Sequence, residues 1–400
     1  MTRVLWVTNV PVHPGGVGDA SYSSWLDLGA EAFIEADVGH LVLTYPGPPG
    51  PLATGSGFTD AGGFSSHSFY GVSRASAVRI IREASVDVVH IHGTESPHSL
   101  PFLLAARSLG IPAIVTLQGL LHRIVPQLSS GLWEFGELGA IRAAVETVPS
   151  SVHMSWGALR ELHIIRSAEF VIGRTSWDRN VTLQINSAAK YFHVDELMRP
   201  EFYEARWSGD ERGPFFLAQC HYPLKGLHKL LAALPLLNID ERMPREIRVA
   251  GRAPSGRRYG DLLRKLESRA PGFKVHHLGP LGADGMVDEL ASSSLALSMS
   301  SIENSSNSIS EAMLMGVPVV GSNVGGTPEL LKWGSLGTVM DVSSRELVAA
   351  AIQSALDFPE RTREKAALGR LEALDRHSKR RVVAQIKDVY SCVLGGNDYK

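Results

Sequence analysis

The chain has 400 residues, which exceeds the usual size of one domain and is enough to bury two hydrophobic cores. Hydrophobic residues make up 44%, charged residues 20%, and the formal net charge is −2. This balance is typical of a soluble globular protein and argues against binding of nucleic acid through bulk positive charge. The two cysteines, Cys220 and Cys392, exclude a disulfide scaffold and predict a reducing, cytoplasmic compartment.

The sequence predicts neither a targeting segment nor a membrane-spanning segment. Residues 1–8 hold one basic residue and a short apolar run, which predicts a first strand and not a signal peptide. The longest apolar stretch, 100–121, is interrupted by Arg107, Gly110 and Pro112, too often for a transmembrane helix. The first half holds 13 Lys and Arg against 17 Asp and Glu, so bulk charge predicts no polybasic anchor and leaves open only a weak peripheral membrane contact.

In the first half, short apolar runs alternate with segments of helix length. Continuous Val, Ile and Leu runs bounded by Gly and Pro are typical of strands in a buried parallel sheet. Strands that alternate with helices indicate βαβ units. The predicted strands are 4–8, 40–44, 86–92, 113–117 and 170–173, and the predicted helices include 21–36 and 73–84.

The second half repeats the alternation. The predicted strands are 215–219, 246–250, 275–278, 295–299 and 317–321, and the predicted helices include 226–237 and 259–269. From residue 345 onward the chain is predicted to be helical, with a break at Pro359 and a last amphipathic helix over 380–394.

The predicted fold class is therefore α/β, with two facing, doubly wound Rossmann-like domains and a cleft between them. We place the first domain at 1–205, the second at 206–379, and the last helix, 380–400, as a segment that crosses back to the first domain. The polar stretch 201–213 is the predicted linker. Ligands of open α/β sheets bind at the carboxyl ends of the strands, so the loops that directly follow strands hold the candidate residues.

A glycine-rich loop at 15–18 follows the first strand, and such a loop lets backbone amides approach a phosphate or a sugar. Its Gly16-x-Gly18 pattern is part of a dinucleotide fingerprint, but Ser21 stands where the third Gly or Ala belongs. No acidic residue ends the second predicted strand, which argues against a nicotinamide-dependent dehydrogenase. A plain strand-to-helix turn remains the alternative interpretation of this loop.

In the second half, Lys225 follows a predicted strand and precedes a predicted helix, so it could reach a diphosphate. The alternative is a solvated surface lysine. The segment from Glu303 to Glu311 also follows a strand and opens a helix, which makes an anion site through free amides and the helix dipole. Here the alternative is a capping box formed by Ser308 and Glu311, with Ser306 or Asn307 as other possible N-caps.

The residues after Glu303-x7-Glu311 carry a family resemblance. They read Gly-Val-Pro-Val-Val at 316–320 and Gly-Gly-Thr-Pro-Glu at 325–329. Lys225-Gly226, the Val-Ala-Gly at 249–251, the strand at 87–92 and the glycine loop occur in the matching order. The whole chain thus resembles the large retaining glycosyltransferase family numbered four, which has the GT-B fold.

The resemblance implies a role for each matching residue. Glu311 would hold the donor ribose, Glu303 would approach the donor sugar, and Lys225 would hold the diphosphate. The base would lie near Arg252 and Leu281. Together with these residues, the implied donor-binding set contains Gly16, Asn304, Ser305, Ser306, Asn307 and Ser308. The implied catalytic residues are Glu303, Lys225 and His92.

The acceptor would bind the first domain, and the acceptor-binding residues predicted there follow strands: Asp19, Glu95, His98 and Gln118. A lone histidine is more often structural than catalytic, so His92 and His98 each keep that alternative. Neither a metal nor another cofactor is expected, since the family usually needs none and the chain has no Asp-x-Asp and no close Cys and His ligand set.

Three positions depart from the family pattern. Cys220 stands where an Arg is common, with His221 beside it, and Gln118 stands where a His is common. Asn304-Ser305 replaces the usual Gly-Phe after the first Glu, a feature similar to a polysaccharide-type subgroup. An active enzyme with altered site geometry is the expectation that follows.

The expected partners are a nucleotide sugar and a glycan, lipid-linked or small-molecule acceptor, with no nucleic acid. The expected reaction moves a sugar to an acceptor hydroxyl with retention and without a metal. A sugar phosphorylase, a nucleotide-sugar epimerase and a non-catalytic nucleotide-sugar-binding protein are the alternatives. The sequence does not indicate the sugar, the base, the acceptor or the oligomeric state.

Overall fold

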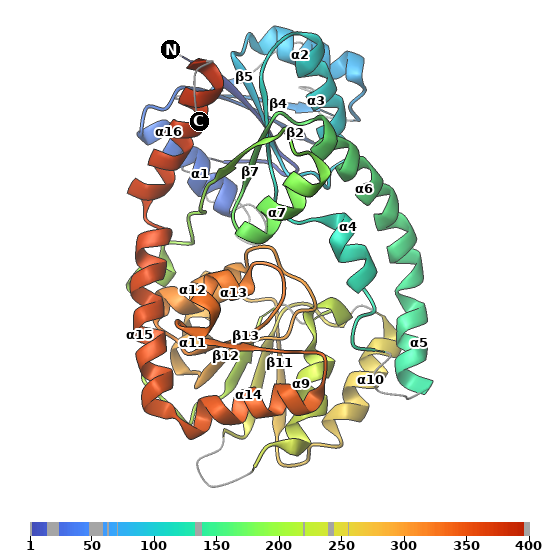
Figure 1. Ribbon diagram of the computed structural model, residues 1–400, viewed down its shortest axis with the longest axis vertical. Coiled ribbons are helices and arrows are strands. Elements are labelled where there is room, and N and C mark those ends of the chain that lie inside the picture. The colour runs from blue at the N-terminus through green and yellow to red at the C-terminus, as the bar shows by residue number, and fades with distance from the viewer. Residues whose placement is uncertain are drawn as a thin grey trace. The chain divides into compact units, whose positions relative to one another are not determined.

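The computed structural model describes residues 2–13, 24–47, 59–61, 64–69, 71–132, 138–218, 221–238, 244–254 and 256–395. The chain forms two compact units, each with its own sheet (Figure 1). Unit 1 comprises Met1–His122, Met154–Leu197 and Arg376–Lys400, and unit 2 comprises Arg123–His153 and Met198–Asp375. Gly16, Asp19 and Cys220 lie outside the described residues.

The sheet of unit 1 has the strand order β3-β4-β2-β1-β5-β6-β7-β8. All neighbouring strands pair in parallel except the edge pair of β3 and β4. Because β2 and β5 lie on opposite sides of β1, the chain order reverses there, which marks the ligand-binding end of a doubly wound sheet. The strands are β1 (Arg3–Val7), β2 (His40–Pro46), β3 (Thr59–Ala61), β4 (Phe64–Phe69), β5 (Val88–His92), β6 (Ala113–Thr116), β7 (Phe170–Gly173) and β8 (Lys190–His193).

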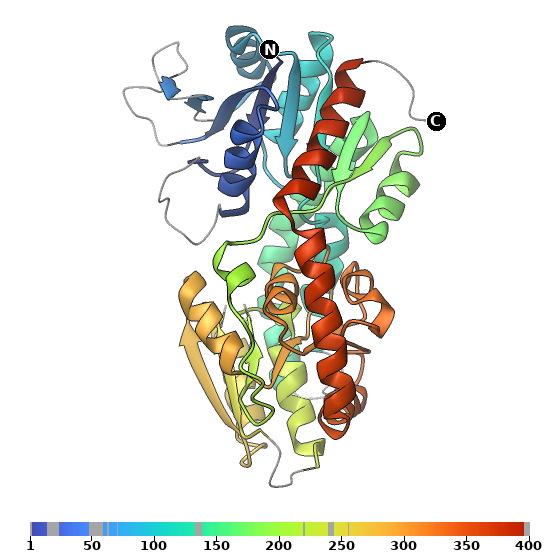
Figure 2. The ribbon, with the colours of Figure 1, turned by 90° about the vertical axis from the view of Figure 1, so that its left-hand side faces the viewer.

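Helices cover both faces of this sheet. On one face, residues of α2, α3 and α7 pack with Leu5, Val89 and Val115. On the other face, residues of α1 and α16 pack with Val4 and Trp6, and Figure 2 shows α16, in red, running along the strands of this unit. The helices are α1 (Ser24–Glu35), α2 (Arg74–Ala84), α3 (Ser99–Ser108), α7 (Ser176–Ile185) and α16 (Lys379–Gly395).

The sheet of unit 2 has the order β11-β10-β9-β12-β13-β14, and every neighbouring pair is parallel. The order reverses at β9, between β10 and β12. Side chains alternate across the sheet, so Phe215 and Leu217 face one core and Phe216 faces the other. The strands are β9 (Phe215–Leu217), β10 (Glu246–Ala250), β11 (Lys274–Gly279), β12 (Leu295–Ser298), β13 (Val319–Ser322) and β14 (Thr338–Met340).

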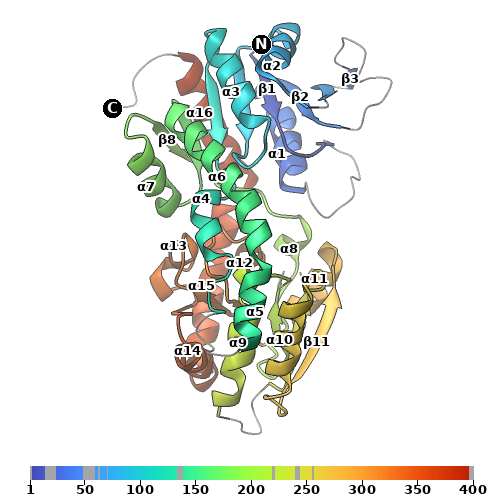
Figure 3. The same cartoon turned by 90° about the vertical axis from the view of Figure 1, so that its right-hand side faces the viewer.

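One core of unit 2 contains residues of α5, α9, α10 and α14, and Figure 3 shows α5 close to α10. The other core contains residues of α8, α11, α12 and α13. The helices are α5 (Leu138–Glu146), α8 (Glu201–Glu204), α9 (Leu227–Ala233), α10 (Arg257–Glu267), α11 (Ala283–Ser292), α12 (Asn307–Met315), α13 (Thr327–Leu330) and α14 (Arg345–Asp357), with 3-10 turns at Val125–Gln127, Pro223–Lys225, Leu234–Leu236 and Lys332–Gly334.

Three further helices contain points where the chain passes from one unit to the other: α4 (Leu121–Ile124), α6 (Val148–Ser167) and α15 (Pro359–Arg376). The fourth passage falls at Leu197/Met198, whereas the sequence predicted a boundary at 205/206. The predicted linker, 201–213, packs within unit 2, because Phe202 is fully buried in its core. The predicted fold class, with two parallel α/β sheets, is confirmed.

Candidate functional site

The candidate donor site of unit 2 lies at the carboxyl ends of β9 and β12, where the strand order reverses. The loop after β9 reaches the loop after β12 through Gly226, whose φ is +76°. A Cβ at Gly226 would lie 2.0 Å from the Met299 carbonyl oxygen, so a glycine is required for this approach. The Ser301 amide donates to the Leu224 carbonyl at 2.8 Å and fixes the two loops side by side.

This arrangement brings Lys225 and Glu303 together. The Lys225 ammonium pairs with Oε1 of Glu303, and both side chains are largely buried. The Ser300 hydroxyl donates to the same oxygen at 2.7 Å. One turn further along α9, the buried Lys229 donates to the Ser301 hydroxyl at 2.9 Å. A carboxylate and a cation thus lie side by side at the strand ends, which is suitable for a ligand with hydroxyl groups and a diphosphate.

The backbone of Glu303 is held by the Gly325-Gly326 loop. The Gly326 amide donates to the Glu303 carbonyl at 3.1 Å. Gly325 has a φ of +54°, and a Cβ there would lie 1.7 Å from that carbonyl oxygen. The Gly-Gly-Thr-Pro-Glu run therefore acts here as the backbone support of Glu303.

The segment after Glu303 leads into α12 at its N-cap, Ser306. The Ser306 side chain makes no capping bond to the helix, and its hydroxyl lies 3.1 Å from that of Ser308. The capping box of Ser308 and Glu311 does not form, because Ser308 lies inside the first turn and Glu311 bonds elsewhere. Asn304 and Ser306 are buried, Ser305 and Ser308 are half-buried, and Asn307 is exposed. The start of α12 thus keeps amides that no side chain of Ser306 covers, which favours an anion.

Glu311 is paired with Arg199. The guanidinium donates to Oε1 of Glu311 from Nε at 3.0 Å and from Nη2 at 2.7 Å. Burial raises the pKa of the Glu311 carboxyl, and Arg199 acts in the opposite direction. Sequence analysis did not identify Arg199, which stands 112 positions before Glu311 and belongs to none of the motifs described above.

The remaining donor candidates lie on neighbouring loops of unit 2. Arg252 is exposed directly after β10, and Leu281 is half-buried after β11 against the core. His221 is half-buried, and burial followed by the nearby Lys225 lowers the pKa of its imidazole. These loops follow β9, β10 and β11 of the same sheet, and a role of Arg252 and Leu281 in binding a base stays a prediction.

The two histidines of β5, His90 and His92, differ in their hydrogen bonding. His90 is fully bonded, with Nδ1 2.6 Å from the Tyr390 hydroxyl and Nε2 2.6 Å from the Thr116 hydroxyl. His92 lies two residues further on the same face, and both of its ring nitrogens are buried without a hydrogen-bond partner among the described residues. Burial lowers the pKa of His92 well below the usual value, with contributions from His90 and Arg174, so its ring is neutral and a poor general base.

Glu95 and Gln118 lie together against Gly93, because a Cβ there would come within 2.5 Å of Glu95 Oε2 and 3.4 Å of Gln118 Cδ. The Gly119 amide donates to Glu95 Oε1 at 3.1 Å. Burial, opposed in part by backbone amides, raises the pKa of Glu95. His98 packs instead against Phe69, with ring centroids 5.1 Å apart, which is the structural role kept open for it.

Comparisons with known proteins agree with this geometry. Residues 212–357 match the family model described as glycosyl transferases group 1. This part of the chain carries the sequence pattern of the group 1 glycosyltransferases. It contains Lys225, Glu303 and Glu311, and the enzyme class predicted from the sequence is confirmed by the match.

The N-acetyl-alpha-D-glucosaminyl L-malate synthase of Bacillus anthracis is 31% identical over 111 residues, which span 28% of this chain and 29% of that enzyme. Sucrose-phosphate synthase from Thermosynechococcus elongatus superposes with a TM-score of 0.68 at 14% identity, over 99% of this chain and 100% of that one. Anabaena HepE in complex with UDP-glucose gives 0.64 at 16% identity, over 98% and 100%. These two solved structures share the GT-B-like fold with this chain.

Two searches of the described residues bear on metal binding and on membrane insertion. No group of three or more His, Cys, Asp and Glu side chains is arranged to hold a metal ion in that part of the chain. Over the same residues, no helix is both long and apolar enough to cross a bilayer.

Proposed function

We propose that the protein transfers a sugar from a nucleoside-diphosphate sugar, such as UDP-glucose, to an acceptor hydroxyl. The observation that carries the proposal is the pairing of Lys225 with Glu303 at the start of α12, with Glu311 further along the same helix. The similarity to HepE, whose structure contains UDP-glucose, supports a uridine nucleotide as the first donor to test.

In the proposed complex, the diphosphate binds Lys225 and the free amides at the start of α12, and Glu311 accepts hydrogen bonds from the ribose. Glu303 accepts from a hydroxyl of the donor sugar. In each carboxylate the cation bonds Oε1, so this bond does not occupy Oε2, which accepts from the ligand in the proposed complex. The base lies along Arg252 and Leu281.

The acceptor binds unit 1, near Glu95, Gln118 and His92. The bond from the anomeric carbon to the diphosphate breaks, the acceptor oxygen bonds to that carbon on the same face, and the acceptor proton passes to the departing phosphate oxygen. Lys225 stabilises the charge that develops on the leaving group. This route retains the anomeric configuration and requires neither a protein nucleophile nor a metal. The acceptor is a glycan, a lipid-linked sugar or a small molecule.

The donor is tested by a thermal-shift panel of UDP-, GDP-, ADP- and dTDP-sugars. We expect one nucleotide class to raise the melting temperature at millimolar concentration, because a ligand that binds the folded state stabilises it. Incubation of that donor without an acceptor should leave its sugar unchanged, whereas an epimerase would convert it. The proposal is lost if no nucleotide shifts the melting temperature.

The site assignment is tested by Glu311→Ala and Glu303→Gln. We expect Glu311→Ala to weaken nucleotide binding by roughly 1–3 kcal/mol, since a charge-assisted hydrogen bond is removed. Glu303→Gln should mainly lower kcat. Isothermal titration with UDP and steady-state kinetics measure the two effects. The control is Glu360→Ala on α15, where the side chain is 82% exposed. If both site variants behave like this control, the assignment is wrong.

A further inference from the structure

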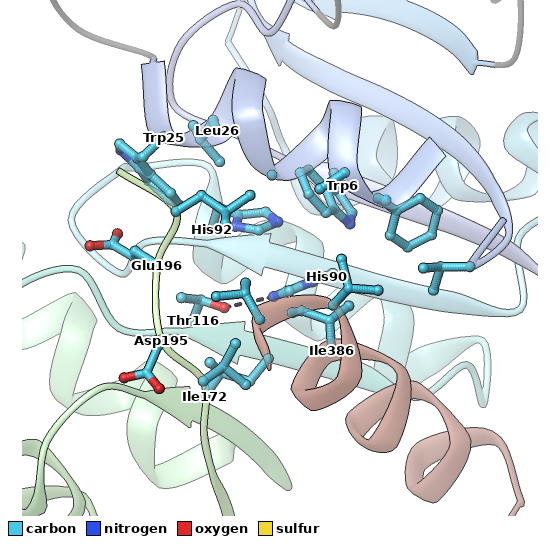
Figure 4. Close-up of a pocket in the computed structure, with 18 of the residues that line it drawn as sticks. Trp6, Trp25, Leu26, His90, His92, Thr116, Ile172, Asp195, Glu196 and Ile386 are labelled. Atoms are coloured by element: carbon cyan, nitrogen blue, oxygen red, sulfur yellow. Dashed lines mark hydrogen bonds between the residues drawn. The ribbon is translucent and has the colours of Figure 1, made fainter. Parts of the chain in front are cut away.

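A cavity of about 70 Å³ lies in unit 1 between the sheet and the helices α1 and α16 (Figure 4). Its walls are mostly apolar side chains, which include Trp6 from β1, Leu26 and Phe33 from α1, and Ile386 from α16. Protein interiors are normally close-packed, yet these large side chains leave a space between them.

Small residues on α1 keep the cavity open. Gly29 and Ala32 both face it. A Cβ at Gly29 would make ordinary contact with the Trp6 ring at 3.6 Å, so a larger side chain there would extend into the space. Glycine is less favourable than alanine inside a helix, so Gly29 lowers the stability of α1 and leaves space in the cavity.

The other end of the cavity is polar. His92 is 5% exposed, and both of its ring nitrogens lack a hydrogen-bond partner among the described residues. In Figure 4 its ring lies between those of Trp25 and Trp6, at centroid distances of 6.0 and 4.4 Å. Glu196, also buried, pairs with Arg174, which follows β7 directly. This polar end lies at the carboxyl ends of β5 and β7, where ligands of such sheets bind.

A buried polar group without a hydrogen-bond partner is unfavourable, and native proteins provide partners for most such groups. The contrast with His90 on the same strand is direct, because His90 has a partner for each nitrogen. A neutral imidazole offers one donor and one acceptor, which matches a hydroxyl group. The cavity therefore combines a site for a hydroxyl group with an apolar interior.

We propose that this cavity binds the part of the acceptor substrate in which a hydroxyl group is attached to a short, branched aliphatic group. The hydroxyl group forms hydrogen bonds with the His92 ring, and three or four carbons fill the space next to Gly29 and Ala32. The size favours this ligand over a ring, because an apolar cavity that holds benzene has about 150 Å³. The identification as an acceptor site rests on the proposed function, whereas the binding chemistry does not.

The probe is 2-methyl-1-propanol, compared with 1,3-propanediol, which has the same number of heavy atoms. Ligand-observed NMR titration gives both dissociation constants. We expect 2-methyl-1-propanol to bind roughly tenfold more tightly, because burial of its methyl groups is favourable, whereas a second hydroxyl would be buried among apolar side chains such as Phe33 and Ile386. Equal affinities would overturn the proposal.

Two variants locate the binding. Gly29→Leu should weaken 2-methyl-1-propanol binding at least tenfold, while Glu31→Leu, on the same helix but outside the cavity lining, should leave it unchanged. His92→Phe keeps an aromatic ring against Trp6 and should weaken binding by roughly three- to tenfold through the lost hydrogen bond. Circular dichroism checks folding, and His92→Phe remains a test if Gly29→Leu does not fold. Binding that is unchanged in a folded variant contradicts the proposal.

The thermal shift with UDP-glucose separates the two proposals. Gly29→Leu should keep the wild-type shift, because none of the residues assigned to the donor belongs to α1. A missing UDP-glucose shift together with intact 2-methyl-1-propanol binding would remove the transferase function and leave the cavity as a binding site. The reverse result would remove the cavity proposal alone.

Discussion

The two carboxylates of the candidate donor site, Glu303 and Glu311, are held in the same way. Lys225 and Ser300 bond Oε1 of Glu303, and Arg199 bonds Oε1 of Glu311 with two nitrogens. In both cases a neighbouring group orients the carboxylate before a ligand arrives. This preorganisation reduces the entropy lost when the donor binds.

Replacement of Arg199 by Met should change the pH dependence of donor binding. Burial raises the pKa of Glu311, while Arg199 lowers it and Glu201 raises it further. Without Arg199 the carboxyl becomes protonated at a higher pH, so binding of UDP-glucose should weaken as the pH falls from 8 toward 5, and earlier than in the wild type. Titration calorimetry across this range measures the shift, and Arg199→Lys should restore part of it. Parallel pH profiles for wild type and Arg199→Met would show that Arg199 does not act through Glu311.

The loop at Gly325 packs against the backbone of Glu303 and holds it in place. Gly325→Ala should be strongly destabilising, by roughly 2–4 kcal/mol, because its Cβ would overlap the Glu303 carbonyl and its φ is +54°. Gly334→Ala is the matched control: its φ is +99°, yet no atom lies within 4 Å of the added Cβ. Urea unfolding of both variants measures the difference. Equal losses would mean that backbone strain alone, and not the contact with Glu303, explains the effect.

The helix α16 is anchored in unit 1 by Tyr390, whose hydroxyl accepts from Trp6 Nε1 at 2.9 Å and lies 2.6 Å from His90 Nδ1. Tyr390→Phe should destabilise the protein by about 1–3 kcal/mol, since buried indole and imidazole groups lose their partner. Urea unfolding measures this loss, and Tyr45→Phe, at a half-buried position of β2, is the control. A loss no larger than that of the control would contradict the anchoring role.

The predictions from sequence were most accurate for strands whose burial on both faces also determines their apolar residue pattern. The strands β7 and β12 have continuous apolar runs because both faces of their sheets are buried. The strand β4, with the sequence Phe-Ser-Ser-His-Ser-Phe, was missed because its few apolar residues do not stand out. The long helix α6 was also missed, since its apolar residues do not follow a single helical face.

The residues of the candidate site also include some that the sequence could predict and some that it could not. Lys225, Glu303 and Glu311 belong to motifs with fixed spacing, so the sequence could predict them. Arg199 and Lys229 could not be predicted, because pairing across 112 and 72 positions depends on the tertiary fold. His92 could not be separated from His90 by sequence, since only the hydrogen-bond partners differ.

Over the whole molecule, several buried histidines are held neutral in the folded state. Burial lowers the pKa of His90 and His228 to about 3, and of His98 and His377 to about 4. The unfolded chain titrates near 6.5 and binds more protons below that pH, so stability should fall as the pH drops from about 6.5 toward 4. Each histidine contributes up to about 1.4 kcal/mol per pH unit.

Urea midpoints at pH 7, 6 and 5 measure this acid sensitivity. His228→Asn should flatten the decline, whereas His153→Gln, at an exposed position, should not. A midpoint that stays constant down to pH 5 would show that these histidines are not kept neutral on folding.

The chain passes between the units four times, and its last passage returns α16 to unit 1. Ribosomal synthesis proceeds from the N-terminus, so Trp6 and His90 emerge long before Tyr390, which stands 300 positions after His90. Unit 2 is fully translated by then. Synthesis of unit 1 thus begins first and ends last. A nascent chain stalled before residue 379 would contain all of unit 2, whereas its unit 1 would lack α16, the helix that packs against Trp6.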